Sequence, residues 1–309
     1  MAVAAFKRRV VVGTIATVFL MFPLAPAHAT WSIVGVDTET QAIGGAVATC
    51  QFYSLSGLIG TVPGRGVMVT QAHLRYASLA TGVQLLAQGS SPGAVITAVT
   101  SPAYDAGWNE RQHGVVTLDG VAAGFTGTHP DEVPQTRGDV QGVDDWFAYS
   151  IQGNILTPNV LTQTQAATHA GCDLPERLMN ALEAGAAGGE GDWRCTKVVP
   201  AAAAFIQVDV PGVPKGEYLK LDVFLPLDGN MVEVHEEDNA VVKLRALFDE
   251  WRLTHPCPAP PEPPDDGEPD AMDGTGGCAA APGALGAMVP LALMVAGVAA
   301  RRRYRSRRT

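Results

Sequence analysis

The stretch Thr30-Trp31-Ser32-Ile33-Val34-Gly35-Val36 combines β-branched, aromatic and small residues and carries no charge. A second small, apolar run occupies residues 43–50, and the turn-forming residues 37–41 separate the two. Two such runs joined by a short turn predict a β-hairpin. We therefore expect the fold to begin at Thr30 with two neighbouring antiparallel strands.

The sequence up to residue 254 continues with alternating strand-like and helix-like patterns. β-rich runs predict strands, apolar residues at helical spacing predict helices, and Asp119-Gly120 predicts a tight hairpin turn. The predicted strands are residues 66–72, 113–118, 121–126, 147–155, 201–210 and 218–224, and the predicted helices are 76–88, 92–100, 159–169, 174–187 and 241–252. Hairpins dominate this order, so residues 30–254 are expected to form one α+β domain of mostly antiparallel sheets covered by helices.

Residues 1–29 have the pattern of a signal peptide. Lys7, Arg8 and Arg9 precede an apolar region at 10–23, and Ala27-His28-Ala29 supplies small residues before a cleavage site. A retained membrane anchor is the alternative, but the apolar region is short for a bilayer span. We expect signal peptidase to cut after Ala29 and the chain to be exported.

The other end of the chain has a second targeting pattern. An acidic, Pro-rich linker at 255–277 ends in Gly276-Gly277, followed by Cys278, an uncharged apolar stretch at 279–300 and six arginines. The alternative is a simple C-terminal anchor. The order of these elements resembles the MYXO-CTERM sorting tails of myxobacteria. The resemblance implies membrane insertion through residues 278–309, processing by a sorting protease near Cys278, and display at the surface of a Gram-negative cell or release from it.

The distribution of charge along the chain limits the classes of function that the protein can have. The chain has a formal net charge of −10, and its two ends hold nine of the 21 basic residues and none of the 31 acidic ones. The acidic middle argues against a nucleic-acid binder.

If Cys278 belongs to the tail, the remaining four cysteines allow three disulfide connectivities. Cys172 and Cys195 bracket a predicted helix, and we expect them to pair. No CxxC, HExxH or nucleotide-binding motif is present, so no metal or cofactor is implied.

Cleavage after Ala29 would make Thr30 the first residue of the mature chain. Its hydroxyl would then lie beside a free α-amine, whose pKa is about 7.7–8.0 and which can accept the hydroxyl proton near neutral pH. An N-terminal threonine thus combines a nucleophile and its base in one residue. The alternative is that Thr30 is an ordinary residue exposed by signal-peptide removal.

Segments along residues 30–252 resemble the DUF1028 family, which is assigned to the Ntn-hydrolase-like superfamily. The resemblance implies a four-layer αββα sandwich with Thr30 at the start of a central strand, and it supplies no substrate. The matching segments are residues 30–34, 45–50, 70–72 with Tyr76, 85–89, 111–112, 126–127, 150–156 and 183–185, together with Gly191-Asp192 and Arg194-Cys195.

Four further residues are candidates for the site. Asn154, which follows Gly153, could donate to an oxyanion or satisfy its own turn. Arg111 could bind a substrate carboxylate or form an ion pair with Glu110 or Asp105. His73 could face the site or be an ordinary surface or core histidine. Cys50 could lie near Thr30 or behave as a small hydrophobe.

One more pair has two interpretations. Asp192 and Arg194 could shape a pocket, although a structural salt bridge is favoured. Two functions therefore remain open. The first is a secreted amidohydrolase in which Thr30 attacks an amide bond of a small molecule or peptide and Asn154 holds the oxyanion. The second is a non-catalytic surface module that binds a ligand.

Overall fold

The computed structural model describes residues 30–128, 136–195, 199–225 and 238–258, all of which belong to one compact unit. The expected signal peptide, most of the linker, and the tail with Cys278 lie outside the described residues. Within the described ranges, no helix is both long and apolar enough to cross a membrane.

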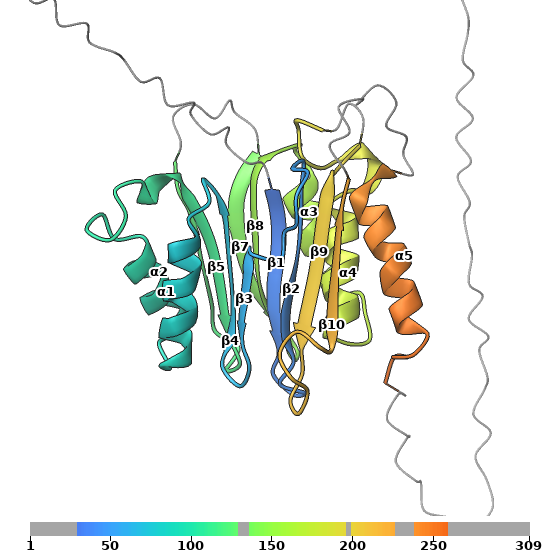
Figure 1. The fold of residues 1–309 in the computed structure, drawn as a ribbon, viewed down its shortest axis with the longest axis horizontal. Coiled ribbons are helices and arrows are strands. Elements are labelled where there is room, and N and C mark those ends of the chain that lie inside the picture. The colour runs from blue at the N-terminus through green and yellow to red at the C-terminus, as the bar shows by residue number, and fades with distance from the viewer. Residues whose placement is uncertain (1–29, 129–135, 196–198, 226–237, 259–309) are drawn as a thin grey trace, which may run out of the picture. The chain divides into compact units, whose positions relative to one another are not determined.

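Within the described residues, ten strands form two antiparallel sheets (Figure 1). The six-stranded sheet has the order β10-β9-β2-β1-β8-β7, and the four-stranded sheet has the order β3-β4-β5-β6. The strands of the larger sheet are β1 (Thr30–Asp37), β2 (Ile43–Thr49), β7 (Thr136–Asp144), β8 (Phe147–Leu156), β9 (Ala203–Asp209) and β10 (Leu219–Phe224). Those of the smaller sheet are β3 (Ile59–Val62), β4 (Gly66–Ala72), β5 (Arg111–Thr117) and β6 (Ala122–Thr126).

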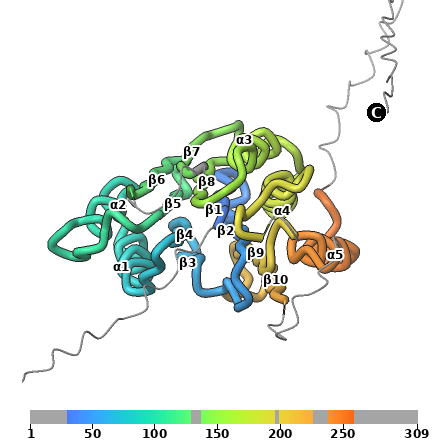
Figure 2. Tube along the Cα trace, turned by 90° about the horizontal axis from the view of Figure 1, so that it is seen from above, coloured from blue at the N-terminus to red at the C-terminus, as the bar shows by residue number. Residues whose placement is uncertain are grey.

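Helices cover the outer face of each sheet. On the smaller sheet lie α1 (Tyr76–Ala87) and α2 (Pro92–Val99), and on the larger sheet lie α3 (Val160–Ala166), α4 (Leu174–Ala184) and α5 (Ala240–Arg252). Two 3-10 turns, η1 (Trp108–Glu110) and η2 (Ala187–Gly189), complete the elements. The inner faces of the sheets pack on each other through β1 with β4 and β8 with β5. Viewed from above, the layers follow in the order helices, sheet, sheet, helices (Figure 2). The predicted four-layer αββα sandwich is confirmed.

Strand β1 is buried along its whole length because it lies between a helical layer and the second sheet. Trp31 and Ile33 point into the core shared with α4 and α5, and the Trp31 indole donates to the Leu182 carbonyl. The alternate residues Val34 and Val36 point to the inter-sheet core. The sequence of a strand that is buried on both faces is a nearly continuous apolar run, and residues 30–36 have this pattern.

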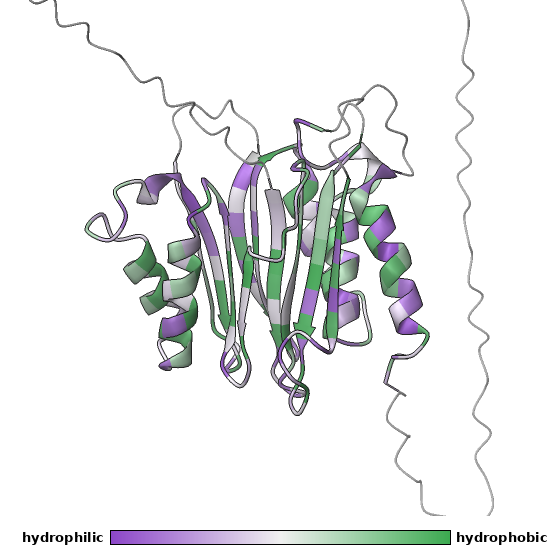
Figure 3. Ribbon diagram, in the orientation of Figure 1, coloured by the Kyte–Doolittle hydropathy of each residue, from purple (hydrophilic) through white to green (hydrophobic). Residues whose placement is uncertain are grey.

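The layer between the sheets has an apolar half and a polar half. Colouring by hydropathy shows hydrophobic and hydrophilic segments on both the strands and the helices (Figure 3). Valines, Ile43 and Phe205 fill one half of this layer. Toward the Thr30 end, the inward positions carry buried polar side chains: Ser32, Thr49, Gln71, Gln112, Ser150, Gln152 and Asn154. A buried polar side chain has to find hydrogen-bond partners, so this end of the layer is built as a network.

The cysteines pair differently from the prediction. Cys50 bonds to Cys195 and Cys172 bonds to Cys257, with Cα atoms 5.6 and 5.8 Å apart. The predicted pair of Cys172 and Cys195 is therefore wrong. The two residues flank α4, whose 11 residues span about 16 Å, and this carries the chain away from Cys172 toward the end of β2.

Candidate active site

Thr30 is the first residue of β1, in the middle of the larger sheet. Its direct partners are Thr49 on β2 and Asn154 on β8. It lies on the same strand face as Ser32, whose hydroxyl donates to Gln71 of the other sheet at 2.7 Å, so Thr30 also faces the inter-sheet layer. Thr30 is buried, and its hydroxyl donates to that of Thr49 at 3.3 Å.

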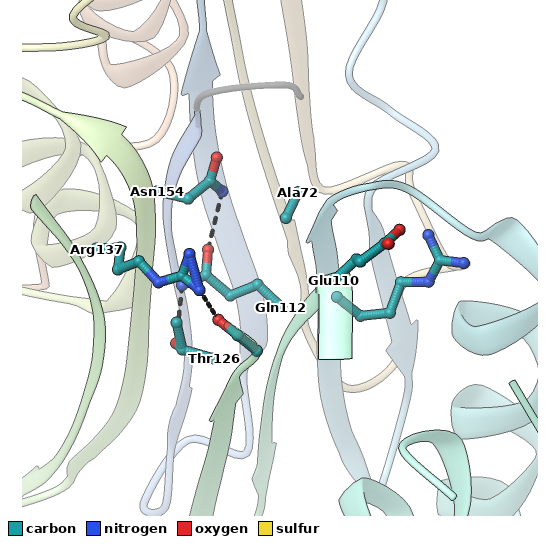
Figure 4. Close-up of a pocket in the computed structure, with 8 residues that line it drawn as sticks. Ala72, Glu110, Gln112, Thr126, Arg137 and Asn154 are labelled. Atoms are coloured by element: carbon teal, nitrogen blue, oxygen red, sulfur yellow. Dashed lines mark hydrogen bonds between the residues drawn. The ribbon is translucent and has the colours of Figure 1, made fainter. Parts of the chain in front are cut away.

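The amide of Gln112 anchors the polar network. Its nitrogen Nε2 lies 2.9 Å from the carbonyl oxygens of Gly138 and Gly153 and from the Thr126 hydroxyl. Backbone carbonyls only accept hydrogen bonds, so this atom must be the nitrogen. Gln112 Oε1 therefore points the other way, toward Asn154, and accepts from its Nδ2 at 3.0 Å (Figure 4).

The same logic orients the neighbouring amides. Gln71 Nε2 uses both of its hydrogens, on Gln112 Oε1 at 2.6 Å and on the Thr30 carbonyl at 3.1 Å. Asn154 Nδ2 uses one hydrogen on Gln112 and has a second one to offer. The opposite atom, Asn154 Oδ1, is buried and has no hydrogen-bond partner among the described residues. Asn154 therefore presents one donor and one acceptor at the Thr30 end of the layer.

A small pocket opens beside Asn154. Its volume is about 10 Å³, which is about the space that one water molecule needs. Asn154 and Arg137 lie on one side of it, the Arg137 guanidinium donates to the Gly127 carbonyl, and the Glu110 carboxylate points away from Asn154 (Figure 4). Its lining residues are Ala72, Glu110, Arg111, Gln112, Thr126, Gly127, Arg137 and Asn154. Thr30 does not line it, but adjoins it through Asn154. Most of the lining residues are polar, so the pocket suits a polar group about as small as a water molecule.

Arg111 lies at the pocket, but its guanidinium is held by an ion pair. Arg111 Nε is 2.8 Å from Asp105 Oδ2, and Nη1 donates to the His73 carbonyl. The hydrogen bond from Arg111 holds the pKa of Asp105 below its usual value. Of the two readings of Arg111, the structure supports the ion pair, with Asp105 as partner.

His73 follows β4 and lies outside the pocket lining. Its Nδ1 is 3.9 Å from Glu110 Oε2. The structure thus places His73 beside a pocket residue without bringing it to Asn154.

Cys50 lies next to Thr49, close to Thr30 as expected, but it is not a free thiol, because it is bonded to Cys195. Its predicted role in substrate binding is replaced by a structural one. The Cys50 N–H donates to Asp192 Oδ2 at 2.7 Å. Asp192 is fully buried and pairs with Arg194 at 2.8 Å. The predicted salt bridge between Asp192 and Arg194 is confirmed.

Sequence reasoning missed the central role of Gln71 and Gln112, and it missed Arg137. A signal for the glutamines was present. Gln71 shares its strand face with Val67 and Val69, so period-2 alternation places a glutamine on an otherwise apolar inner face. Arg137 gave no such signal, because the apolar side chains of its strand, Val140 and Val143, do not alternate with period 2.

Another histidine, His113, lies on the opposite face of the smaller sheet. His113 is fully buried, and neither ring nitrogen has a hydrogen-bond partner among the described residues. Burial, with Arg111 nearby, lowers the pKa of His113 to about 4. The ring is therefore neutral at physiological pH and belongs to the core beside the helices. In the described ranges, no group of three or more His, Cys, Asp or Glu side chains is placed to hold a metal ion.

Comparisons with known proteins identify similar sequences and folds. A model of DUF1028, described as a family of unknown function, matches residues 30–245. The crystal structure of protein SPO2555 from Silicibacter pomeroyi, described as DUF1028, is similar with a TM-score of 0.57 and 26% sequence identity, over 72% of this chain and 86% of that one. No match was found among curated proteins.

Proposed function

The chain belongs to the DUF1028 family, and from this membership and the position of Thr30 we propose that the mature protein is an N-terminal-nucleophile amidohydrolase of the Ntn-hydrolase superfamily. One observation carries the proposal. Thr30 opens a central strand, faces the layer between two sheets, and lies directly opposite an asparagine with an unused donor. The family match also begins at Thr30.

The chemistry follows from these atoms. The hydroxyl oxygen of Thr30 attacks the carbonyl carbon of a bound amide while the α-amine takes the hydroxyl proton. The carbonyl oxygen becomes an oxyanion, which the second hydrogen of Asn154 Nδ2 stabilises. The C–N bond then breaks, and the leaving nitrogen takes the proton from the α-ammonium. Water hydrolyses the ester left on Thr30, with the α-amine again acting as base.

The pocket suggests the size of the substrate. Its volume of about 10 Å³ and its polar lining residues leave room beside the scissile amide for only a very small polar group, in a small molecule or a peptide. The requirement for a free α-amine makes removal of residues 1–29 part of activation, because an amide nitrogen cannot act as the base.

We also propose export, with signal peptidase and a C-terminal sorting protease as processing partners. Two disulfides within the described residues support this location, since disulfides persist in oxidising compartments. The MYXO-CTERM-type tail would place the processed protein at the surface of a Gram-negative cell or release it.

The test combines mass spectrometry of the mature N-terminus with turnover of a panel of small amides and peptides. We expect a chain starting at Thr30, no turnover by Thr30→Ala, and residual turnover by Thr30→Ser. The exposed Thr97→Ala on α2 is the matched control. Full turnover by Thr30→Ala would overturn the mechanism. Ligand binding without turnover, unchanged in Thr30→Ala, would favour the non-catalytic module.

A further inference from the structure

Asp192 lies in line with β1, just beyond Thr30. Strand β8 continues past Asn154 to Leu156, which pairs with Thr136 of β7 on one side and forms an isolated antiparallel bridge with Asp192. Because β7 occupies one edge of β8 there, Asp192 is on the other edge, where β1 runs. The backbone of Asp192 thus follows Thr30 along the strand axis.

The carboxylate of Asp192 reaches the same place from the β2 side. The Thr49 carbonyl accepts from Ala202 at 2.9 Å, so Thr49 directs its backbone polar groups toward β9. Successive residues of a strand alternate, so the Cys50 N–H points toward β1, and it donates there to Asp192 Oδ2 at 2.7 Å. The buried carboxylate therefore lies between the ends of β2 and β8, at the end of β1.

The alternation also fixes the direction of the Thr30 nitrogen. Since Thr49 directs its polar groups away from β1, the pair Thr30–Thr49 is of the non-hydrogen-bonded kind, and the backbone groups of Thr30 face β8. One N–H of the α-amine points across to Asn154 of β8, as the backbone N–H of a strand residue does. Cleavage replaces the preceding peptide bond of the Thr30 nitrogen by an N–H, which points along the strand axis toward Asp192.

We infer that Asp192 is a positioning residue that accepts a hydrogen bond from the α-amine of mature Thr30, and that Arg194 balances its charge. A lone carboxylate beside the amine would hold it as ammonium, a form that cannot take the hydroxyl proton. Arg194 contacts both carboxylate oxygens, with Nε 3.1 Å from Oδ1 and Nη2 2.8 Å from Oδ2. The buried, unpartnered Asn154 Oδ1 supplies a further acceptor at this end.

The disulfide holds this arrangement in place. The Cys195 N–H donates to the Asp192 carbonyl at 2.9 Å, and the Cys195 sulfur is bonded to Cys50. Both ends of the short turn from Asp192 to Cys195 are therefore tied to Cys50, the residue that follows β2. Proteins fix the position of a catalytic base through such supporting contacts.

Several other charged and titratable side chains lie near this end of the layer. Arg111 is paired with Asp105, Glu110 and Arg137 line the pocket, His73 follows β4, and Tyr53 lies in the segment after β2. None of them is changed in the variants below, so a shift of the Thr30 amine in those variants reports on the pair Asp192–Arg194.

The experiment measures the pKa of the Thr30 α-amine in the processed, disulfide-bonded protein. The readout is competitive acylation with acetic anhydride across pH, quantified on the N-terminal peptide by mass spectrometry. Asp192→Asn leaves the guanidinium facing the amine, so the pKa should fall by about one pH unit. Arg194→Gln leaves the carboxylate alone, so the pKa should rise by a similar amount. If Asp192→Asn does not fold, the pKa of the Thr30 α-amine in Arg194→Gln alone tests the inference.

Asp173→Asn is the matched control. Asp173 also adjoins a disulfide cysteine, Cys172, and pairs with an arginine, Arg252, at 2.6 Å, but it caps α4 away from Thr30. This variant should lose stability without moving the amine pKa.

The inference depends on the proposed processing at Thr30 and not on turnover. Opposite shifts without turnover of any amide would leave the inference standing and count against the amidohydrolase. Turnover with an unmoved amine pKa in both variants would overturn the inference and leave the enzyme standing. A mature N-terminus other than Thr30 would overturn both.

Discussion

Thr30 and Asn154 are direct cross-strand partners, although β1 and β8 lie far apart in the sequence. Both side chains face the layer between the sheets, and both are buried. A hydroxyl and an amide donor thus share one end of the sandwich, beside a polar pocket. This pairing was expected from the sequence only on the hypothesis that the two residues act on the same atom.

Asn154→Ala should lower kcat by about 10²–10³-fold, because removal of one oxyanion donor has a cost of this order. KM should change little, since the lost bond forms mainly in the transition state. Steady-state kinetics on an amide identified as substrate tests this. Asn159→Ala, which removes an exposed asparagine paired with Glu190, should leave kcat unchanged. An unaltered kcat in Asn154→Ala would remove Asn154 from the mechanism.

Gln112→Glu should destabilise the fold strongly. The substitution turns the Nε2 donor into an oxygen that faces the carbonyls of Gly138 and Gly153, in a fully buried position. The free energy of unfolding should fall by about 3 kcal/mol or more, because a buried charge loses its partners. Urea unfolding at neutral pH measures the loss. The exposed Gln84→Glu on α1 should change stability by less than about 0.5 kcal/mol, and an equal effect of the two would contradict the network.

His113 should make the protein less stable in mild acid. Its pKa is about 4 in the folded state against 6.5 for the ordinary side chain. The neutral form is favoured by folding, so this contribution is complete above pH 6.5 and is lost as the pH falls toward 4. The loss amounts to about 3 kcal/mol. The difference in unfolding free energy between wild type and His113→Gln should shrink over that interval. A difference that stays constant from pH 7 to 4 would contradict a buried neutral imidazole.

The two disulfides should be separable by function. Each closes a long loop, with sequence separations of 145 and 85 residues, and chain entropy predicts a stabilisation of about 4–5 kcal/mol for each. Replacing Cys50 and Cys195 together by serine should lower both Tm and turnover, because Asp192 loses its tether. Replacing Cys172 and Cys257 should lower Tm alone. Thermal unfolding and initial rates test this, and equal losses of turnover would contradict the special place of the first disulfide.

Local sequence patterns predicted those strands and helices that depend on their own residues and not on their neighbours in the fold. The run at 30–36 forms β1, and the strand predicted at 66–72 has the bounds Gly66–Ala72. Asp119-Gly120 forms the expected turn between β5 and β6, where Gly120 has a φ of 81°. In each case a periodic pattern or a residue that tolerates positive φ was enough.

Other elements depend on their neighbours. Strand β7 was not predicted, because Thr136–Asp144 is a polar edge strand without apolar alternation, held by its pairing with β8. Strand β3 has only four residues and was too short to recognise. The pairing of Cys50 with Cys195 depends on where the chain returns after α4, which no local pattern encodes. The amide orientation around Gln112 likewise follows from carbonyls of β7 and β8.

The place of β1 in the sheet also sets the order in which the site is assembled. Its neighbour β2 follows within a few residues, but β8 lies more than half the described chain away. Pairings between distant segments form late in folding, because a long loop must close first. An exported chain that crosses the membrane from its N-terminus delivers Thr30 well before Asn154. On the proposed export and mechanism, the hydroxyl, the amide donor and the carboxylate of Asp192 would come together only after residue 192 has crossed, and the chain would carry no assembled hydrolytic centre while it is in transit.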